Sequence, residues 1–179
     1  MKFALQAAVA MALAAATPAF AATAVAPAAA AASPDAAHVQ AVHDLLASMQ
    51  VQYLLNGVAA RSHYSSEAQR NAVYAKIEKT PPEQIYQRMA VPLAKVIATD
   101  TALEMTRFYN TPYGKQVIHK RYNSGPQIQI PGMQAAVPPE ERKERKRAAF
   151  VQASQKLAEA EPAIDHEAFL LLQQISKEK

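Results

Sequence analysis

Apolar residues recur every three or four positions along most of this chain, which is the period of an amphipathic helix. Ser33-Pro34-Asp35 indicates a helix start, because a cap residue precedes a proline and an acid. Asn56-Gly57 is typical of a helix end. The pattern therefore predicts a first helix between these signals, with an apolar face of Val39, Val42, Leu46, Met49 and Tyr53.

Two further start signals open the next two helices. Ser65 or Ser66 is predicted to cap the first of them. The second begins at Thr80-Pro81-Pro82-Glu83, which combines a capping box with an early proline. Pro92 lies inside its apolar pattern and predicts a kink. The residues predicted to face inward are Val73 and Ile77, then Ile85, Met89, Leu93 and Val96.

The rest of the chain is predicted to be helical outside one segment. Thr101 to Glu104 forms another capping box, and Thr111-Pro112 restarts a helix. Residues 123–138 lack a helical pattern, which indicates a surface strap or a functional loop. Pro138-Pro139-Glu140 opens a long charged helix, and Pro162 separates it from a last helix. The last helix has an apolar stripe of Ile164, Ala168, Leu171, Leu172 and Ile175. The apolar residues of the helices before it are Leu103, Met105 and Phe108; Val117 and Ile118; and Phe150, Val151 and Leu157.

These patterns predict an all-α fold, a single-domain bundle of about seven helices over residues 33–179. The chain has only four glycines, against twelve prolines, which leaves little material for the hairpin turns of an all-β fold. Its 179 residues, half of them hydrophobic, suffice for one core.

The N-terminal segment predicts export. Met1-Lys2 gives a positive start, a run of small apolar residues extends from Phe3 to Ala16, and Ala19-Phe20-Ala21 matches a signal-peptidase site. The run is shorter than the roughly 20 residues that span a bilayer, and no later segment is long and apolar enough. We interpret residues 1–21 as a cleaved signal peptide and 22–32 as an Ala-rich flexible tether, so the protein is expected in the periplasm or secreted, not in a membrane.

No pattern indicates catalysis, a metal or a cofactor. The chain has no cysteine, and its five histidines lack the spacing of a helical zinc site. Asp100 and Glu104 could form an acid/base pair, but a helix start explains them better. Ser62 precedes His63 without the strand–elbow context of a nucleophile. The net charge of +4 is too small to indicate nucleic acid by itself.

The run from Glu140 to Arg147 contains five basic and three acidic residues. One interpretation is a solvated helix extension with internal ion pairs. The other is contact with an anionic surface, such as lipid headgroups or cell-envelope polymers. The residues that would make this contact are Arg142, Lys143, Arg145, Lys146 and Arg147.

The segment from Phe108 to Lys115 resembles the domain of unknown function 2059 family of small exported helical proteins. That family shows an aromatic pair, Thr or Ser, Pro, a variable residue, Gly, and Lys or Arg. The resemblance extends over residues 80–122 and implies an all-helical exported protein, but no activity and no catalytic residues. The positions that fit the motif are Phe108, Tyr109, Thr111, Pro112, Gly114 and Lys115.

In physical terms this motif predicts a helix junction. Pro112 disfavours helical geometry at the preceding residue, which suits Thr111 as a cap. Gly114 falls in the first turn of the next helix, where glycine costs about 0.5–1 kcal/mol relative to alanine. Close approach of another backbone would offset that cost, and contact with a ligand or partner is the alternative interpretation.

Three functions stay open from the sequence. The first is a non-enzymatic binding or envelope-associated protein with an unidentified partner. The second is an enzyme whose site is assembled from residues distant in sequence. The third is attachment to anionic envelope components, which predicts association that weakens with salt.

We expect the exported protein to begin at Ala22, because Ala19-Phe20-Ala21 is the best small-x-small site in the chain. The intact mass of protein recovered from the periplasm measures this directly. A mass that retains Met1 to Ala21 would contradict it.

Overall fold

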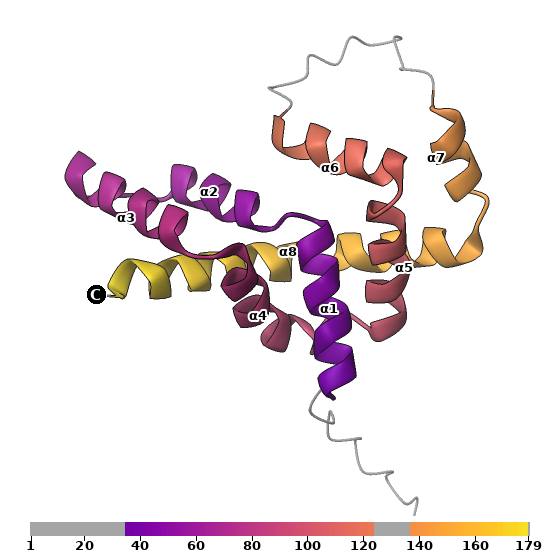
Figure 1. Ribbon diagram of the computed structural model, residues 1–179, viewed down its shortest axis with the longest axis horizontal. Coiled ribbons are helices and arrows are strands. Elements are labelled where there is room, and N and C mark those ends of the chain that lie inside the picture. Colours follow the sequence, from indigo (N-terminus) through magenta and orange to yellow (C-terminus); the bar gives the residue numbers. More distant parts are fainter. Residues whose placement is uncertain (1–34, 124–136, 179) are drawn as a thin grey trace, which may run out of the picture. The chain divides into compact units, whose positions relative to one another are not determined.

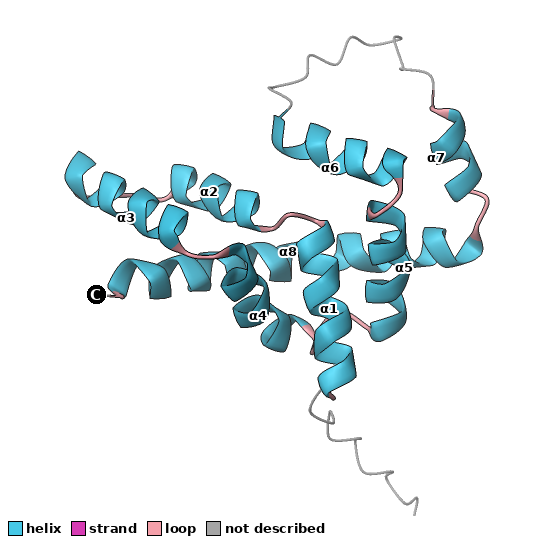
Figure 2. Cartoon of the chain, in the orientation of Figure 1, coloured by secondary structure: helices cyan, strands magenta, loops and turns pink. Residues whose placement is uncertain are grey.

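A computed structural model describes residues 35–123 and 137–178 (Figures 1 and 2). Within these two ranges all regular structure is helical, so the all-α prediction is confirmed there. The signal peptide, the tether and nearly all of the 123–138 segment lie outside the described residues. The helices are α1 (Ala36–Ser48), α2 (Gln52–Arg61), α3 (Glu67–Lys79), α4 (Pro82–Leu93), α5 (Thr99–Tyr109), α6 (Pro112–Asn123), α7 (Pro139–Glu144) and α8 (Ala148–Lys177).

The first predicted helix is divided into α1 and α2 by a turn at Gln50. The Gln50 amide donates to the Ala47 carbonyl and the Val51 amide to the Leu46 carbonyl, which is the pattern of a Schellman C-cap. Gln50 has the left-handed φ of 53° that this cap requires. The expected end at Asn56-Gly57 is wrong, because both residues lie inside α2. This turn could not be predicted from a local pattern, because glycine is the usual residue at the left-handed position and glutamine occupies it here.

The predicted caps have mixed outcomes. The Asp35 side chain caps α1 by accepting from the His38 amide at 2.6 Å, whereas the predicted cap residue Ser33 lies outside the described residues. Ser66 caps α3, as predicted. The box at Thr80 is wrong, because the Thr80 hydroxyl donates back to the Lys76 carbonyl at the end of α3.

The second predicted box is wrong as well. Helix α5 begins at Thr99, and its N-cap is Ala98. Thr101 is therefore inside the helix and only 2% exposed. Glu104 forms ion pairs instead of a capping bond.

Helix α8 runs continuously through Pro162, so the predicted break there is wrong. A proline inside a helix costs about 3 kcal/mol, because it removes one backbone hydrogen bond and crowds the preceding turn. Leu157, Ala160 and Ile164 are buried on both sides of Pro162. Since each buried Leu or Ile contributes about 1.5–3 kcal/mol, packing on both flanks offsets the cost of the proline.

The core lies where α8 meets the earlier helices. Helices α2, α3, α4 and α5 all pack against α8, while α1 packs against α4 and α5. In Figure 1, α5 lies across α8, and α2 and α3 lie on the side of its C-terminal half. The stripe predicted for the last helix is confirmed, because each of its members is buried: Ile164, Ala168, Leu171, Leu172 and Ile175.

Two residues predicted to face inward, Tyr53 and Val96, are exposed instead, and so are the apolar residues Leu103 and Val151. Tyr53 follows the turn at Gln50, which rotates α2 relative to the apolar face of α1. Val96 lies beyond the end of α4, the helix that contains Pro92 in its last turn. When the apolar period of one helix is extended past the end of that helix, it therefore predicts the wrong face for the next apolar residue. None of the described helices is both long and apolar enough to cross a membrane.

Candidate functional site

The sequence motif forms the junction between α5 and α6. The Thr111 hydroxyl accepts from the Gly114 amide at 2.9 Å and donates to the Phe108 carbonyl at 2.7 Å. One side chain therefore caps the start of α6 and also satisfies a carbonyl at the end of α5. The predicted cap at Thr111 is confirmed. Pro112 is the first residue of α6, where its missing amide hydrogen costs nothing.

Gly114 lies where the backbone of α5 comes closest to α6. A Cβ at this position would overlap the Phe108 carbonyl oxygen and lie 2.7 Å from the Cα of Tyr109. These neighbours are backbone atoms, which cannot rotate away as a side chain can. The close backbone approach expected at Gly114 is confirmed, and the approaching segment is the end of α5.

The aromatic pair of the motif fixes this junction in the core. Phe108 and Tyr109 are both buried. The Phe108 ring lies 4.7 Å from that of Phe150 in α8 and 6.2 Å from that of Tyr113 in α6. Such tilted and edge contacts contribute about 0.5–1.5 kcal/mol each beyond burial. The motif thus ties α5, α6 and α8 together.

Tyr113, the variable residue of the motif, joins the junction to the charged helix α7. Its hydroxyl donates to Glu141 Oε2 at 2.6 Å, and Arg145 Nε donates to Glu141 Oε1 at 2.9 Å. Burial raises the pKa of the Tyr113 hydroxyl to about 12, and the bond to Glu141 adds to the shift. The same hydrogen bond, together with that from Arg145, lowers the pKa of the Glu141 carboxyl.

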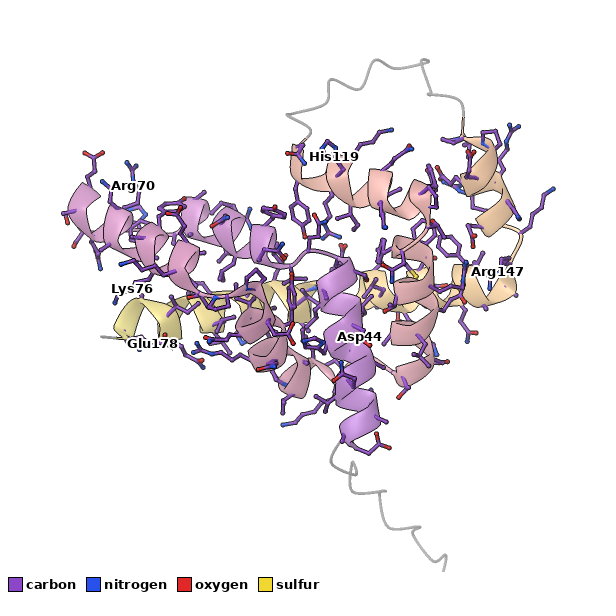
Figure 3. The ribbon with its side chains drawn as sticks, in the orientation of Figure 1. Asp44, Arg70, Lys76, His119, Arg147 and Glu178 are labelled. Carbon is purple, nitrogen blue, oxygen red and sulfur yellow. The ribbon has the colours of Figure 1, made fainter. Side chains whose placement is uncertain are left out.

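An ion-pair network of four residues joins α5 to the end of α7. Arg107 lies 2.8 Å from Glu104 and 2.6 Å from Glu144, and Arg147 lies 2.7 Å and 2.9 Å from the same two carboxylates. The two carboxylates are mostly shielded, at 15% and 14% side-chain exposure. Networks of this kind hold their geometry better than isolated surface pairs. Arg147, labelled in Figure 3, is the N-cap residue of α8.

The five basic residues predicted to meet an anionic surface therefore divide into two groups. Arg145 and Arg147 are held by carboxylates of the protein itself. Arg142, Lys143 and Lys146 are exposed and form no ion pair with another described residue. Lys115 and Lys120 on α6 are exposed and unpaired in the same sense. We call the five unpaired cations the basic surface: Lys115, Lys120, Arg142, Lys143 and Lys146.

The other candidate residues have structural contacts. The Ser62 hydroxyl donates to the Val58 carbonyl at 2.9 Å. Ser62, His63 and Asp165 line one groove between α2, α3 and α8, but no hydrogen bond joins them within the described ranges. Asp100 is exposed and lies 3.9 Å from Lys156. Among the described residues there is no group of three His, Asp or Glu side chains that could hold a metal ion.

Comparison with known proteins adds no identification. No family model matches the chain, and neither curated proteins nor solved structures give a match. The resemblance to the domain of unknown function 2059 family stays a prediction, which the geometry of the junction neither requires nor opposes.

Substituting the two helical glycines should have opposite effects. Gly114→Ala should lower the free energy of unfolding by about 1–3 kcal/mol, because the methyl group overlaps backbone. Gly57→Ala is the matched control: its Cβ meets only Arg61 Nη1, at 3.4 Å, so better helix propensity should raise stability by up to about 1 kcal/mol. Urea unfolding of both variants measures this. Gly114→Ala as stable as wild type would show that α5 and α6 are not in close contact.

The Tyr113–Glu141 bond should make stability depend on pH in two windows. The lowered pKa of Glu141 means that its contribution is full above about pH 4.3 and is lost as the pH falls through the folded-state value. The raised pKa of Tyr113 means that its contribution is lost as the pH rises from about 10 towards about 12. Urea unfolding of wild type and Tyr113→Phe should differ most near neutral pH. A difference independent of pH would contradict this coupling.

Proposed function

We propose that this chain is an exported, non-enzymatic protein of the cell envelope that attaches to an anionic envelope surface through the basic surface. Export is inferred from the leader-like sequence at residues 1–21. Attachment is inferred from the charges that α6 and α7 present to solvent.

The distribution of charge is the observation that carries the proposal. Residues 112–147 contain eight basic and three acidic residues, whereas the rest of the chain contains eleven basic and twelve acidic residues. The positive excess of the protein thus comes from α6, α7 and the sequence between and directly after them. A local excess of this kind concentrates the electrostatic potential on one region of the protein.

The contacts of α7 support the same proposal. The three acidic residues of α7 differ in exposure: Glu141 and Glu144 are half-buried and bonded to Tyr113, Arg145, Arg107 and Arg147, whereas Glu140 is exposed. Two of the three acids are therefore neutralised within the protein. The exposed cations that form no ion pair with another described residue are Arg142 and Lys143 on α7 and Lys146 directly after it.

The triple variant Arg142→Gln, Lys143→Gln, Lys146→Gln should lose attachment to anionic vesicles. Each Lys or Arg near such a surface contributes about 1 kcal/mol, so the partition coefficient should fall by about 100-fold. Co-sedimentation with vesicles of phosphatidylglycerol and phosphatidylcholine at low salt measures this. Stability should change little, because the three side chains are exposed.

The matched control removes three positive charges elsewhere, with Lys79→Gln, Lys95→Gln and Lys177→Gln. These lysines are exposed and form no ion pair with another described residue. The control should sediment nearly as wild type does. An equal loss of co-sedimentation in both triple variants would show that net charge, and not the basic surface, causes attachment. Failure of the wild-type protein to co-sediment would overturn attachment to lipid.

A further inference from the structure

A polar cleft of about 920 Å³ lies between α2, α3 and the end of α6, and it is separate from the α5–α6 junction. Tyr53 on α2, Tyr74 on α3 and Tyr122 on α6 line its walls. Figure 3 shows His119, another lining residue, at the end of α6. Two consecutive helices, α2 and α3, and the more distant α6 thus contribute to one concave surface.

Aromatic side chains form part of the lining of the cleft. Tyr53 is 49% exposed, and its ring lies 5.5 Å from that of Tyr122. The turn at Gln50 produces this exposure, because it removes Tyr53 from the apolar face that begins in α1. An exposed aromatic face in a cleft provides an apolar contact for a flat or ring-shaped ligand.

The side chains that carry a charge in the lining of the cleft are all positive. Arg61 and Arg121 contribute guanidinium groups, and no Asp or Glu is among the described residues that line the cleft. Arg121 also lies 3.2 Å from Glu161, so this ion pair already uses some of the N–H donors of Arg121. A guanidinium recognises a carboxylate through two parallel hydrogen bonds. The cleft therefore favours a ligand with anionic oxygens, such as the carboxylates of an acidic sugar; a phosphate group can be bound in the same way.

Amide side chains complete the lining with groups that both donate and accept. Gln50, Asn56 and Asn123 all line the cleft. Asn123 Nδ2 donates to the His119 carbonyl at 2.8 Å, which leaves its Oδ1 as an acceptor. Hydroxyl groups also donate and accept, so amides suit ligands that carry several of them.

Gln50 also departs from the local rule for its position. Its φ of 53° is a conformation in which glycine is favoured over other residues. The C-cap of α1 accounts for this conformation, and non-glycine residues held in it are also found in clusters at functional sites. Here the Gln50 side chain lines the cleft.

We propose that this cleft binds an acidic oligosaccharide: tyrosine rings contact the sugar faces, the amides bond hydroxyl groups, and Arg61 and Arg121 bind carboxylates. A free phosphate would make no use of the tyrosines, and a neutral sugar would make no use of the arginines. This site does not rest on the basic surface, since none of the five cations of that surface lines it.

Isothermal titration calorimetry of the full exported chain tests the proposal, with tetragalacturonic acid as the probe. Arg61→Gln should weaken binding by about tenfold or more, because it removes a charge-assisted hydrogen bond. Arg70→Gln is the matched control, because Arg70 is an exposed arginine of the neighbouring α3 that does not line this cleft. It should bind as wild type does.

A second variant separates binding from folding. Gln50→Gly removes the amide side chain and relieves the left-handed backbone, so it should weaken binding by several-fold while thermal stability stays the same or rises. Tyr53→Ala should also weaken binding with little effect on stability, because Tyr53 is exposed.

Four outcomes would overturn the proposal. They are no binding of tetragalacturonic acid by wild type, equal binding of the neutral cellotetraose, equal loss in Arg61→Gln and Arg70→Gln, and tighter binding of adenosine monophosphate. The last would assign the cleft to nucleotides. Each can occur whether or not the chain attaches to vesicles, so this proposal and the proposed function fail separately.

Discussion

The continuous apolar stripe of α8 is the feature on which the other helices depend. Helices α2 to α5 pack on it, and α1 is placed through α4 and α5. A helix of 30 residues is about 45 Å long, so one element can serve partners along its whole length. A break at Pro162 would divide this stripe. Burial of Leu157 and Ile164 on both sides of the proline keeps the helix in one piece.

Helix α7 is attached by a different kind of interaction. It has no buried residue, and its contacts are the Tyr113–Glu141 hydrogen bond and the network of Glu104, Arg107, Glu144 and Arg147. Polar attachments of this kind are weaker than apolar packing and are screened by salt. The carboxylates that hold α7 in place are partly shielded from solvent by these contacts. The unpaired cations form no such contacts, so they stay exposed to solvent.

The two proposed binding regions share α6 but use different parts of it. Lys115 and Lys120 belong to the basic surface, whereas His119, Arg121 and Tyr122 line the cleft with α2 and α3. The junction at Thr111 to Gly114 fixes the start of α6 against α5. The rigid motif is thus a structural support, and the groups suited to binding lie around it rather than in it.

The helical class, two of the caps and most of the predicted core-facing residues follow from local sequence patterns. Ser66 and Thr111 were identifiable because a cap bonds within a single turn. The stripe from Ile164 to Ile175 was identifiable because its period is unbroken. Both kinds of signal are local, so they can be recognised without knowing where the rest of the chain lies.

The remaining features depend on contacts between residues far apart in the sequence. Arg147 finds Glu104 across 43 positions of sequence, so its pairing is invisible to local patterns. The turn at Gln50 lacks the usual glycine, and it alone moves Tyr53 from the expected core into the cleft. The continuity of α8 through Pro162 likewise depends on neighbours that offset a local cost. In each case the outcome depends on residues distant in sequence, whose contacts outweigh the local preference.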